Sequence, residues 1–376
     1  MVNMAVLIVA GGRGERAGAG LPKQYRRLGG RPMLARTIAA FRGVGPIQVV
    51  IGADDAEAFA AAAKGFDLLP PVIGGPNRQA SVLAGLEALA SHKPHFVLIH
   101  DAARPLVSAA VIARVTAALE AGVEAVVPAL AVVDALKDKE SWNSVAREAL
   151  LRVQTPQGFR FSVILAAHRA QAGRAAADDI AIAQTAGMKI VGVAGDERNM
   201  KITSAEDFSI AKNLLGRETR TAMGFDAHRF GPGDHVWLCG VKIAHSAGLI
   251  GHSDADAGLH ALTDAILGAI GAGDIGQHFP PSDEKWRGAS SDQFLKHAAS
   301  LVREAGGAIV HCDVTLICEA PKITPHREAM RARIAEILGL DISHISVKAT
   351  TTEGMGFTGR REGVAAQALA TVELCR

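Results

Sequence analysis

The sequence predicts an α/β protein of two domains, and three observations carry that prediction. Short β-rich apolar runs alternate with alanine-rich helical patterns through the first half of the chain. A glycine-rich loop follows the first apolar run, and a separate group of aspartate and histidine residues begins beyond the middle, at Asp226. The 376 residues also exceed what one hydrophobic core usually organises, since domains typically contain about 100–200 residues.

The order of elements in the first half favours a parallel sheet. Apolar β-rich runs predict strands at residues 6–10, 48–51, 96–100, 124–127 and 189–193. Helical patterns occupy residues 33–41, 78–90 and 109–120. Such alternation predicts parallel strands joined by crossover helices, with ligands at the carboxyl ends of the strands. Near residues 214–220 a helical pattern stops and a new strand begins, so we expect domains at 1–217 and 220–376.

Charge, hydropathy and cysteine content exclude several classes of protein. The 40 basic and 38 acidic residues leave a formal net charge of +2, which argues against a nucleic-acid-coating protein. No apolar run approaches the roughly 20 residues of a membrane-spanning helix. The four cysteines lack Cys-x-x-Cys spacing, and the N-terminus is typical of a buried strand rather than a signal peptide. We therefore expect a cytoplasmic protein that binds neither nucleic acid nor membranes.

The loop after the first strand has the composition of a triphosphate cradle. Gly11 and Gly12 let backbone N–H groups approach phosphate oxygens, while Arg16 and Lys23 add positive charge. The loop is not a Walker motif, because no Gly-Lys-Ser/Thr ending is present, and its glycine spacing differs from the dinucleotide fingerprint. A glycine pair alone is as often a simple turn, so the interpretation depends on residues further along the chain.

Those residues carry a family resemblance over positions 1 to about 215. They are Arg16, Arg78 and the strings Ala10-Gly11-Gly12-Arg13-Gly14, Pro22-Lys23-Gln24-Tyr25, Ser81-Val82-Leu83-Ala84-Gly85-Leu86, His100-Asp101-Ala102-Ala103-Arg104-Pro105, Thr155-Pro156-Gln157 and Asn199-Met200-Lys201-Ile202-Thr203. In this order they resemble 2-C-methyl-D-erythritol 4-phosphate cytidylyltransferase. The resemblance implies a doubly wound, Rossmann-like nucleotidyltransferase domain that joins CTP to methylerythritol phosphate and releases diphosphate.

The same resemblance implies roles for individual residues at the nucleotide. Arg16 and Lys23 hold and polarise the triphosphate, which stabilises charge on the phosphate under attack. Asp101 holds Mg²⁺, and Ser81, with the main chain near Gly75, binds cytosine and ribose. Isolated from this context, Asp101 reads more simply as a helix cap.

The second substrate is assigned by resemblance alone. Arg147 and Lys201 are expected to grip the methylerythritol phosphate. The chain departs from the family at Ala135, where a threonine contacts that phosphate, so one substrate contact differs. A competing interpretation is a nucleotidyltransferase for sugar phosphates or molybdopterin, since such enzymes share the glycine loop.

Beyond the middle of the chain, residue spacing predicts a metal site. Asp226 and His228 are two positions apart, so on a strand their side chains share one face, and His260 lies in a helical pattern. Two imidazoles and one carboxylate suit Zn²⁺ with an open fourth position. Asp256 and Asp264 lie four residues either side of His260, which leaves them as supports for that ligand or as helix-surface charges.

This half resembles a second family from about residue 220 to residue 375, 2-C-methyl-D-erythritol 2,4-cyclodiphosphate synthase. The strings are Gly224-Phe225-Asp226-Ala227-His228, His252-Ser253-Asp254-Ala255-Asp256, Leu259-His260-Ala261-Leu262-Thr263-Asp264-Ala265, Gly273-Asp274-Ile275-Gly276, Ala320-Pro321-Lys322 and Lys348-Ala349-Thr350-Thr351-Thr352-Glu353 with Gly356-Phe357-Thr358-Gly359-Arg360. The resemblance implies an α/β homotrimer with active sites between neighbours, which cyclises a CDP-methylerythritol 2-phosphate and expels CMP.

By this second resemblance, Asp226, His228 and His260 bind Zn²⁺ or another divalent ion, and Glu353 helps to hold a second ion, usually Mg²⁺. Catalysis then consists mainly of positioning and charge neutralisation. The remaining contacts to substrate are Asp274 with the methylerythritol hydroxyls, His252 and Ser253 with the attacking phosphate, and Ala320, Pro321, Lys322, Thr351, Phe357 and Arg360 with the nucleotide side.

Together the two resemblances predict a bifunctional isoprenoid-precursor enzyme that requires Mg²⁺ for both reactions. The ATP-dependent kinase step between the two reactions has no candidate segment, so association with a separate kinase is one way to connect them. We expect a homo-oligomer that contains trimers of the C-terminal domain. The non-enzyme alternative is that the second half is a metal-binding oligomerisation module.

Overall fold

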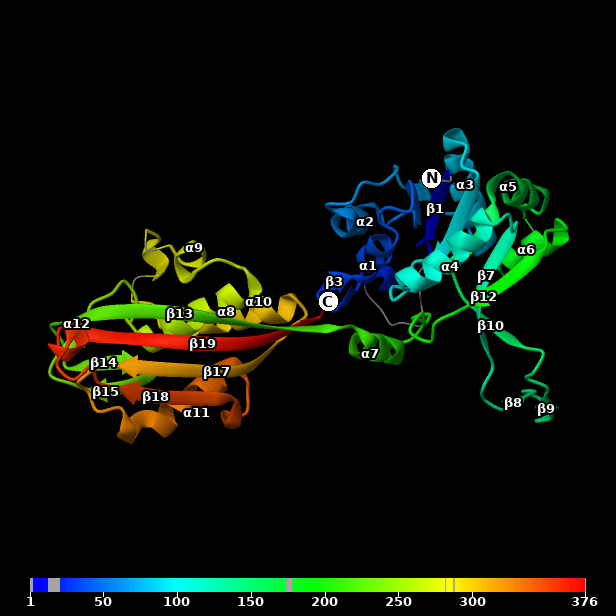
Figure 1. Cartoon of the computed structure of the whole chain (residues 1–376). Helices are drawn as coiled ribbons and strands as arrows, with labels where there is room; N and C mark the ends of the chain where they lie inside the picture. The colour runs from blue at the N-terminus through cyan, green and yellow to red at the C-terminus, as the bar shows by residue number, and fades with distance from the viewer. Residues whose placement is uncertain (1–2, 13–20, 174–177, 281, 287, 376) are drawn as a thin grey trace. The chain divides into compact units, whose positions relative to one another are not determined.

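The computed structural model describes residues 3–12, 21–173, 178–280, 282–286 and 288–375. The chain separates into two compact units, Met1–Leu215 and Gly216–Arg376, which are considered individually (Figure 1). A helix, α7 (Ala205–Leu214), ends just before the division between the units, and a strand, β13 (Arg217–Gly231), begins just after it.

The N-terminal unit contains an eight-stranded sheet of order β10-β7-β11-β6-β1-β4-β5, with β12 also paired to β7. Its strands are β1 (Met4–Val9), β4 (Ile47–Ile51), β5 (Val72–Ile73), β6 (Phe96–Asp101), β7 (Ala125–Ala131), β10 (Leu151–Val153), β11 (Gln157–Arg160) and β12 (Ile190–Ala194). β1 lies parallel between β4 and β6, and β12 is parallel to β7. The five predicted strands are all present.

The expected parallel arrangement is incomplete. β11 runs antiparallel to both β6 and β7, and β10 runs antiparallel to β7. These strands are short and separated only by a few residues around Pro156, so neither makes a pattern that stands out in the sequence. Their pairing is imposed by the neighbouring long strands, so the sheet is mixed, with antiparallel β11 lying between β6 and β7 and β10 at one end of the strand order.

Helices cover both faces of this sheet, because successive side chains of β1 point to opposite sides. Val6 and Ile8 pack into one core with α1 (Met33–Ala40), α2 (Ala56–Ala63) and α4 (Ala109–Glu120). Ala5 and Leu7 pack into another with α3 (Arg78–Leu89), α5 (Phe161–Ala170) and α6 (Asp179–Thr185). The unit is therefore doubly wound, as predicted. Its short elements are η2 (Lys23–Tyr25), β2 (Arg27–Leu28), β3 (Arg31–Pro32) and η3 (Ala90–His92).

An arm extends from this unit between β7 and β10 (Figure 1). It carries the small hairpin of β8 (Leu136–Lys137) and β9 (Ser144–Val145). Val133, Trp142 and Leu150 are exposed apolar residues on this segment. The arm holds Ala135 and Arg147, two positions that the sequence connected with the second substrate.

The C-terminal unit contains a five-stranded sheet of order β16-β13-β19-β17-β18. β19 (Gly363–Cys375) pairs antiparallel with β13 and with β17 (Ala308–Ile317), and β17 is parallel to β18 (Ile345–Thr350). The other elements are β14 (His235–Leu238), β15 (Val241–Ala244), β16 (Gly248–Leu249), α8 (Ala257–Ile270), α9 (Ile275–His278), η4 (Glu284–Trp286), α10 (Asp292–Glu304), η5 (Thr324–His326), α11 (Arg327–Leu338), η6 (Ile342–His344) and α12 (Gly356–Gly359).

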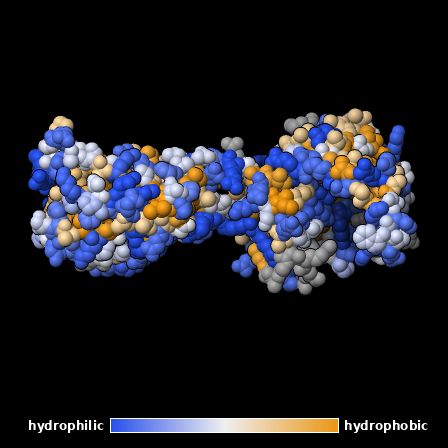
Figure 2. Space-filling model, turned by 90° about the horizontal axis from the view of Figure 1, so that it is seen from below, coloured by the Kyte–Doolittle hydropathy of each residue, from blue (hydrophilic) through white to orange (hydrophobic). Residues whose placement is uncertain are grey.

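One core fills this unit, formed by α8, α10 and α11 against the sheet. The alternation along β13 turns Gly224, Asp226 and His228 toward α8, and it turns Met223 and Phe225 to the other face. Met223, Phe225 and their neighbour Leu369 on β19 are exposed. On the side of the molecule seen in Figure 2, apolar patches lie among hydrophilic residues on both units. Among the residues described, no helix is long and apolar enough to cross a membrane.

Candidate functional site

A cavity of about 620 Å³ opens at the carboxyl ends of β1, β4 and β6, where the sequence placed the nucleotide. The lining includes seven residues predicted for this site: Gly11, Gly12, Lys23, Gly75, Ser81, Asp101 and Lys201. Arg16 lies outside the described residues. The cavity therefore brings together, in one place, residues that are up to 190 positions apart, from Gly11 to Lys201.

Asp101 ends β6 and is an ionised, buried carboxylate in this cavity. Lys201 Nζ lies 2.8 Å from one of its oxygens, and Arg78 Nη2 lies 3.4 Å from the other. Burial alone would raise the pKa of Asp101, but the charges of Arg78 and Lys201 outweigh it and hold that pKa well below its usual range. A carboxylate in this state at neutral pH is a suitable ligand for a hard divalent cation. Asp101 is not a helix cap, because the helix that follows β6, α4, is capped by Ser108.

Arg78 continues the network behind the cavity. Its Nη2 lies 2.7 Å from Asp179 Oδ2, and Asp179 Oδ1 lies 3.3 Å from His168 Nε2. Asp179 and His168 are both fully buried. Sequence reasoning noted Arg78 only as part of the first resemblance, and it missed Asp179 and His168. The available signals were the position of Arg78 beside the string that begins at Ser81 and the paired aspartates Asp178-Asp179.

Close backbone approaches shape the nucleotide side of the cavity. A Cβ atom at Gly74 would lie 2.7 Å from Ser81 Oγ, and one at Gly75 would lie 2.4 Å from the Cβ of Ala80. The Ser81 hydroxyl donates to the Asn77 carbonyl oxygen at 2.9 Å. At Gly12, by contrast, an added Cβ would meet no protein atom within 4 Å. Protein packing therefore demands glycine at Gly74 and Gly75 but leaves open space at Gly12.

Lys23 is held at the rim by its neighbours. Its Nζ donates to the Ile202 carbonyl oxygen at 2.9 Å, and the adjacent Gln24 side chain donates to the Ala10 carbonyl oxygen at 2.7 Å. Arg147 behaves differently, because it lies on the exposed arm, where it contacts the Val133 carbonyl oxygen. Arg147 is not among the residues that line the cavity. The fold of a single chain does not bring it to Asp101.

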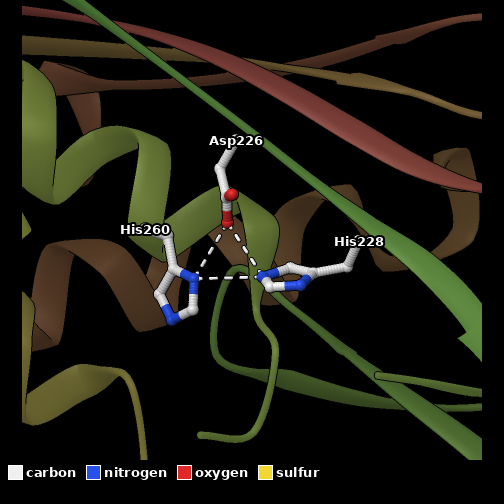
Figure 3. Close-up of side chains that lie close together, drawn as sticks. All are labelled: Asp226, His228 and His260. Carbon is white, nitrogen blue, oxygen red and sulfur yellow. Dashed lines mark hydrogen bonds and ion pairs between the residues drawn. The ribbon is translucent and has the colours of Figure 1, made fainter. Parts of the chain in front are cut away.

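In the C-terminal unit, Asp226, His228 and His260 converge on one point (Figure 3). Asp226 Oδ2 lies 2.9 Å from His228 Nε2 and 2.9 Å from His260 Nδ1, and the two nitrogens are 3.2 Å apart. Burial alone would raise the pKa of Asp226, but its hydrogen bonds to the two histidines outweigh it and hold that pKa below its usual range. We call this group the Asp226 triad. Two nitrogens and one anionic oxygen turned inward fit a divalent cation.

Local sequence explains how the triad is assembled. Asp226 and His228 share one face of β13, as predicted, and His260 lies in α8. Gly224 lets α8 approach the strand, because a Cβ there would lie 2.0 Å from the Ala261 carbonyl oxygen. Asp256 caps α8 by accepting the Leu259 N–H at 3.0 Å, and it also accepts the N–H groups of Cys239 and Gly240.

Asp256 and Asp264 are therefore neither supports for the His260 ring nor simple surface charges. Asp256 is fully buried as a helix cap, and Asp264 Oδ1 accepts the Ile275 N–H at 2.7 Å. That contact fixes the start of α9, whose cap is Asp274. Both residues lie four positions from His260 in the sequence. However, α8 begins one residue after Asp256, so the Asp256 carboxylate accepts from backbone N–H groups instead of supporting the His260 ring.

The remaining predicted substrate contacts form two groups. Ser253 Oγ lies 3.1 Å from His260 Nε2, which places the segment containing His252 and Ser253 next to the triad. The second group lies after β18. There the Thr351 hydroxyl donates to Glu353 Oε1 at 2.7 Å, and the Thr352 N–H donates to Glu319 at 3.2 Å. These contacts join the loop after β18 to the segment that contains Ala320, Pro321 and Lys322, near α12 with Phe357 and the following Arg360.

Glu353 belongs to this second group. Its φ of 51° is in the left-handed region, which is uncommon for a residue with a side chain and often marks a functional site. Within the described part of one chain, no hydrogen bond or ion pair connects Glu353 or Thr351 to the Asp226 triad.

Comparison with known proteins decides the family. Residues 4–217 match the family 2-C-methyl-D-erythritol 4-phosphate cytidylyltransferase, and residues 219–373 match the YgbB family. The bifunctional enzyme IspD/IspF of Paramagnetospirillum magneticum is 53% identical over 385 residues, and the match covers 100% of both chains. The chain belongs to the bifunctional IspD/IspF enzymes.

Other bifunctional IspD/IspF enzymes agree with this assignment. That of Bradyrhizobium diazoefficiens is 54% identical, and the match covers 98% of this chain and 96% of the relative. Among solved structures, the bifunctional IspDF from Campylobacter jejuni is 33% identical with a TM-score of 0.53, covering 99% of this chain and 98% of that one. This IspD/IspF chain therefore has cytidylyltransferase and 2,4-cyclodiphosphate synthase activities in the methylerythritol phosphate pathway. The sugar-phosphate and non-enzyme alternatives are not supported.

Proposed function

We propose that the N-terminal cavity is the site of cytidylyl transfer. Arg16 and Lys23, with the backbone N–H groups of Gly11 and Gly12, would hold and neutralise the triphosphate of CTP. Ser81, with the backbone near Gly75, would bind cytosine and ribose. The close packing at Gly74 and Gly75 supports the assignment of Ser81 and Gly75, because an added Cβ would lie 2.7 Å from Ser81 Oγ at Gly74 and 2.4 Å from the Ala80 Cβ at Gly75. Asp101 would hold Mg²⁺, which supplies charge neutralisation at the phosphates when bound. Its depressed pKa favours this role.

Lys201 would bind the phosphate of methylerythritol phosphate together with Arg147. Lys201 lines the same cavity as Asp101 and lies 2.8 Å from it, so a phosphate bound to Lys201 would be held close to the metal ligand. Such positioning of two anionic reactants is the main contribution that a protein makes to phosphoryl transfer. Arg147 lies on the arm, and its participation would need the arm to reach a cavity, in this subunit or in a second one.

We further propose that the Asp226 triad holds Zn²⁺ in the cyclisation site. When bound, Zn²⁺ would supply charge neutralisation at the diphosphate of the substrate. The carrying observation is the convergence of His228 Nε2 and His260 Nδ1 on a single Asp226 oxygen. Ser253 with His252 would orient the attacking phosphate, and the cap residue Asp274 would bind methylerythritol hydroxyls.

The other half of the cyclisation site would come from a neighbouring subunit. Ala320, Pro321, Lys322, Thr351, Phe357 and Arg360 would bind the nucleotide side, and Glu353 would hold the second divalent ion, Mg²⁺. These residues make no described contact with the triad in one chain, which favours a site completed in a trimer. The exposed Met223, Phe225 and Leu369 on the sheet face away from α8 are suited to such an assembly. No described feature supports association with a kinase.

One variant tests the zinc site and the independence of the two activities. His228→Ala should lose zinc and CMP release from CDP-methylerythritol 2-phosphate, while diphosphate release from CTP and methylerythritol phosphate continues. His235→Ala is the matched control, because His235 is also a histidine of this unit paired with an aspartate, Asp234, but lies outside the triad. Zinc content and both activities are measured on the same preparation, with its mass in solution. Full zinc and full CMP release in His228→Ala would refute the ligand assignment.

A further inference from the structure

His260 has a second ring nitrogen that faces away from the triad. In Figure 3 the Nδ1 atom of His260 points to Asp226, whereas the other nitrogen, Nε2, points to the opposite side. There it lies 2.8 Å from Ser291 Oγ and 3.1 Å from Ser253 Oγ. The shorter of these contacts comes from a residue that no sequence motif singled out.

Ser291 is fixed in place. Its side chain is fully buried, immediately before α10. Its hydroxyl oxygen is hydrogen-bonded to Asp254 Oδ1, and its backbone N–H donates to Asp254 Oδ2 at 2.9 Å. The Asp254 N–H in turn donates to the Ala289 carbonyl oxygen at 3.2 Å. One carboxylate therefore holds both the hydroxyl and the backbone of Ser291, so that little freedom remains in the contact to His260.

The direction of these hydrogen bonds follows from the chemistry of the groups. An ionised carboxylate only accepts, so the Ser291 hydroxyl must donate its hydrogen to Asp254. The Ser291 oxygen is then free to accept, and a hydrogen on His260 Nε2 is the donor that faces it. When a cation replaces the hydrogen bond between Nδ1 and Asp226, a hydrogen kept on Nε2 leaves Nδ1 the lone pair that a metal ligand requires.

We propose that Asp254 and Ser291 are positioning residues that select the Nδ1-ligand tautomer of His260 and fix its ring for the metal. This inference rests on the proposed zinc role of the Asp226 triad. The chain of groups runs from Asp254 through Ser291 to His260 Nε2, and its far end, Nδ1, lies 2.9 Å from Asp226. Partners of this kind raise the basicity of a histidine ligand and hold its orientation.

The arrangement also gives Ser291 and Ser253 different roles. Because Nε2 carries a hydrogen and donates it to Ser291, it cannot accept from Ser253, whose hydroxyl hydrogen stays available for another acceptor. That leaves Ser253 able to donate to a phosphate, the role assigned to it above. The neighbouring His252 carbonyl oxygen accepts the Gly288 N–H at 2.8 Å, so the segment leading to Ser291 also holds the substrate-binding segment.

Zinc affinity of the full-length protein tests the inference directly. Ser291→Ala removes the acceptor for Nε2–H without removing a helix cap, because the Ser291 side chain makes no capping hydrogen bond. We expect zinc to bind about 10–100-fold more weakly, as measured by competition with a chelating indicator. Asp254→Asn should weaken binding similarly, and Ser291→Thr, which keeps the hydroxyl, should restore most of it. CMP release by Ser291→Ala should recover when zinc is raised, which a misfolded unit would not do.

Ser290→Ala is the matched control, because Ser290 is the adjacent serine and its hydroxyl bonds to Asp292 instead. It should bind zinc as the parent protein does. If His260→Ala loses zinc but Ser291→Ala binds it with unchanged affinity, the positioning role is wrong while the zinc site stands. If His260→Ala itself retains zinc, the proposed function fails instead. Failure of Ser291→Thr to restore affinity, or an equal loss in Ser290→Ala, would also overturn the positioning role.

Discussion

Arg78 Nη2 lies 2.7 Å from Asp179 Oδ2, and the same nitrogen lies 3.4 Å from Asp101 Oδ1. One guanidinium group therefore links a carboxylate buried in the core to a carboxylate that lines the nucleotide cavity. Burial alone would raise the pKa of Asp179, but the charge of Arg78 outweighs it and lowers that pKa. The position of Arg78 at the cavity thus depends on a residue that no substrate can touch.

Removing the buried charge should destabilise the N-terminal unit strongly. Asp179→Asn leaves Arg78 with an uncompensated charge toward the core, and breaking a buried pair in this way costs about 3–5 kcal/mol. Hydrogen exchange followed by mass spectrometry measures the loss in β1 and β6, with peptides of the C-terminal unit as an internal reference. Asp178→Ala is the control, because Asp178 only caps α6 and loss of a cap costs about 0.5–2 kcal/mol. An equal effect of the two changes would contradict the importance of the Arg78 pair.

Acid should weaken the same unit through His100. Burial lowers the pKa of His100 to about 4, although the Asp101 charge acts in the opposite direction. The unfolded chain takes up a proton below about pH 6.5, whereas the folded imidazole stays neutral until about pH 4. The free energy of unfolding should therefore fall as pH decreases from about 6.5 to about 4, by about 3 kcal/mol at most.

Variants separate His100 from other titrating groups. The substitution His100→Asn should flatten this part of the pH profile. The control substitution His95→Asn, at an exposed histidine, should leave the profile unchanged. The carboxylates with lowered pKa values act at lower pH, because their contribution is present above the unfolded pKa of about 4 and is lost below it. Hydrogen exchange of β6 peptides, corrected for intrinsic rates, gives the profile. An unchanged slope in His100→Asn would assign it to another residue.

Lys23 should matter for transfer and not for cyclisation. Lys23→Ala removes a preorganised charge from the cavity rim, which typically raises the barrier by on the order of 3 kcal/mol, or slows the reaction on the order of 100-fold. Diphosphate release from CTP measures transfer, and CMP release measures cyclisation on the same sample. Lys64→Ala, at an exposed lysine outside the cavity, should leave both rates as they are. Normal diphosphate release by Lys23→Ala would remove Lys23 from the mechanism.

The contact between β13 and α8 should tolerate a methyl group at one glycine and not at another. At Gly224 a Cβ would lie 2.0 Å from the Ala261 carbonyl oxygen, so Gly224→Ala must push α8, with His260, away from Asp226. Zinc binding and stability should both fall. At Gly268 an added Cβ would meet only the Ala222 Cβ, at 3.4 Å, so Gly268→Ala should be neutral or stabilise the helix slightly. Zinc titration and thermal unfolding of both variants make the comparison, and equal behaviour would contradict it.

The sequence alone was enough to predict features that depend on a repeating pattern or on the spacing of residues close together in the chain. Strand and helix periodicity placed β1, β4 and β6 with the cavity at their ends, and the two-residue spacing of Asp226 and His228 placed both on one strand face. Hydrogen bonds and ion pairs between residues far apart in the chain produce no such pattern in the sequence. Asp179 reaches Arg78 only because α6 packs beside α3 and α5, and Ser291 reaches His260 only through the fold of the preceding segment.

The two antiparallel strands of the N-terminal sheet were missed for a related reason. β10 and β11 contain too few residues to show a period, and their antiparallel direction is set by pairing with β6 and β7. Asp256 was placed correctly near His260, but its side chain became a cap because backbone N–H groups at the start of α8 need acceptors. Spacing in the sequence thus identifies which residues are neighbours. The backbone groups that need hydrogen-bond partners then determine which contacts each side chain makes.

The pairing of β13 with β19 has a consequence for how the C-terminal unit can be handled. Arg217 lies opposite Cys375 in the ladder, so the chain enters and leaves this unit at one place. A short peptide could join these two positions, and new ends could be opened at an exposed turn, without removing any strand from the sheet. Such a circular permutant should still cyclise its substrate. A module with adjacent ends can be attached to another enzyme through a single peptide bond, leaving the hydrogen-bonding pattern of its own sheet intact.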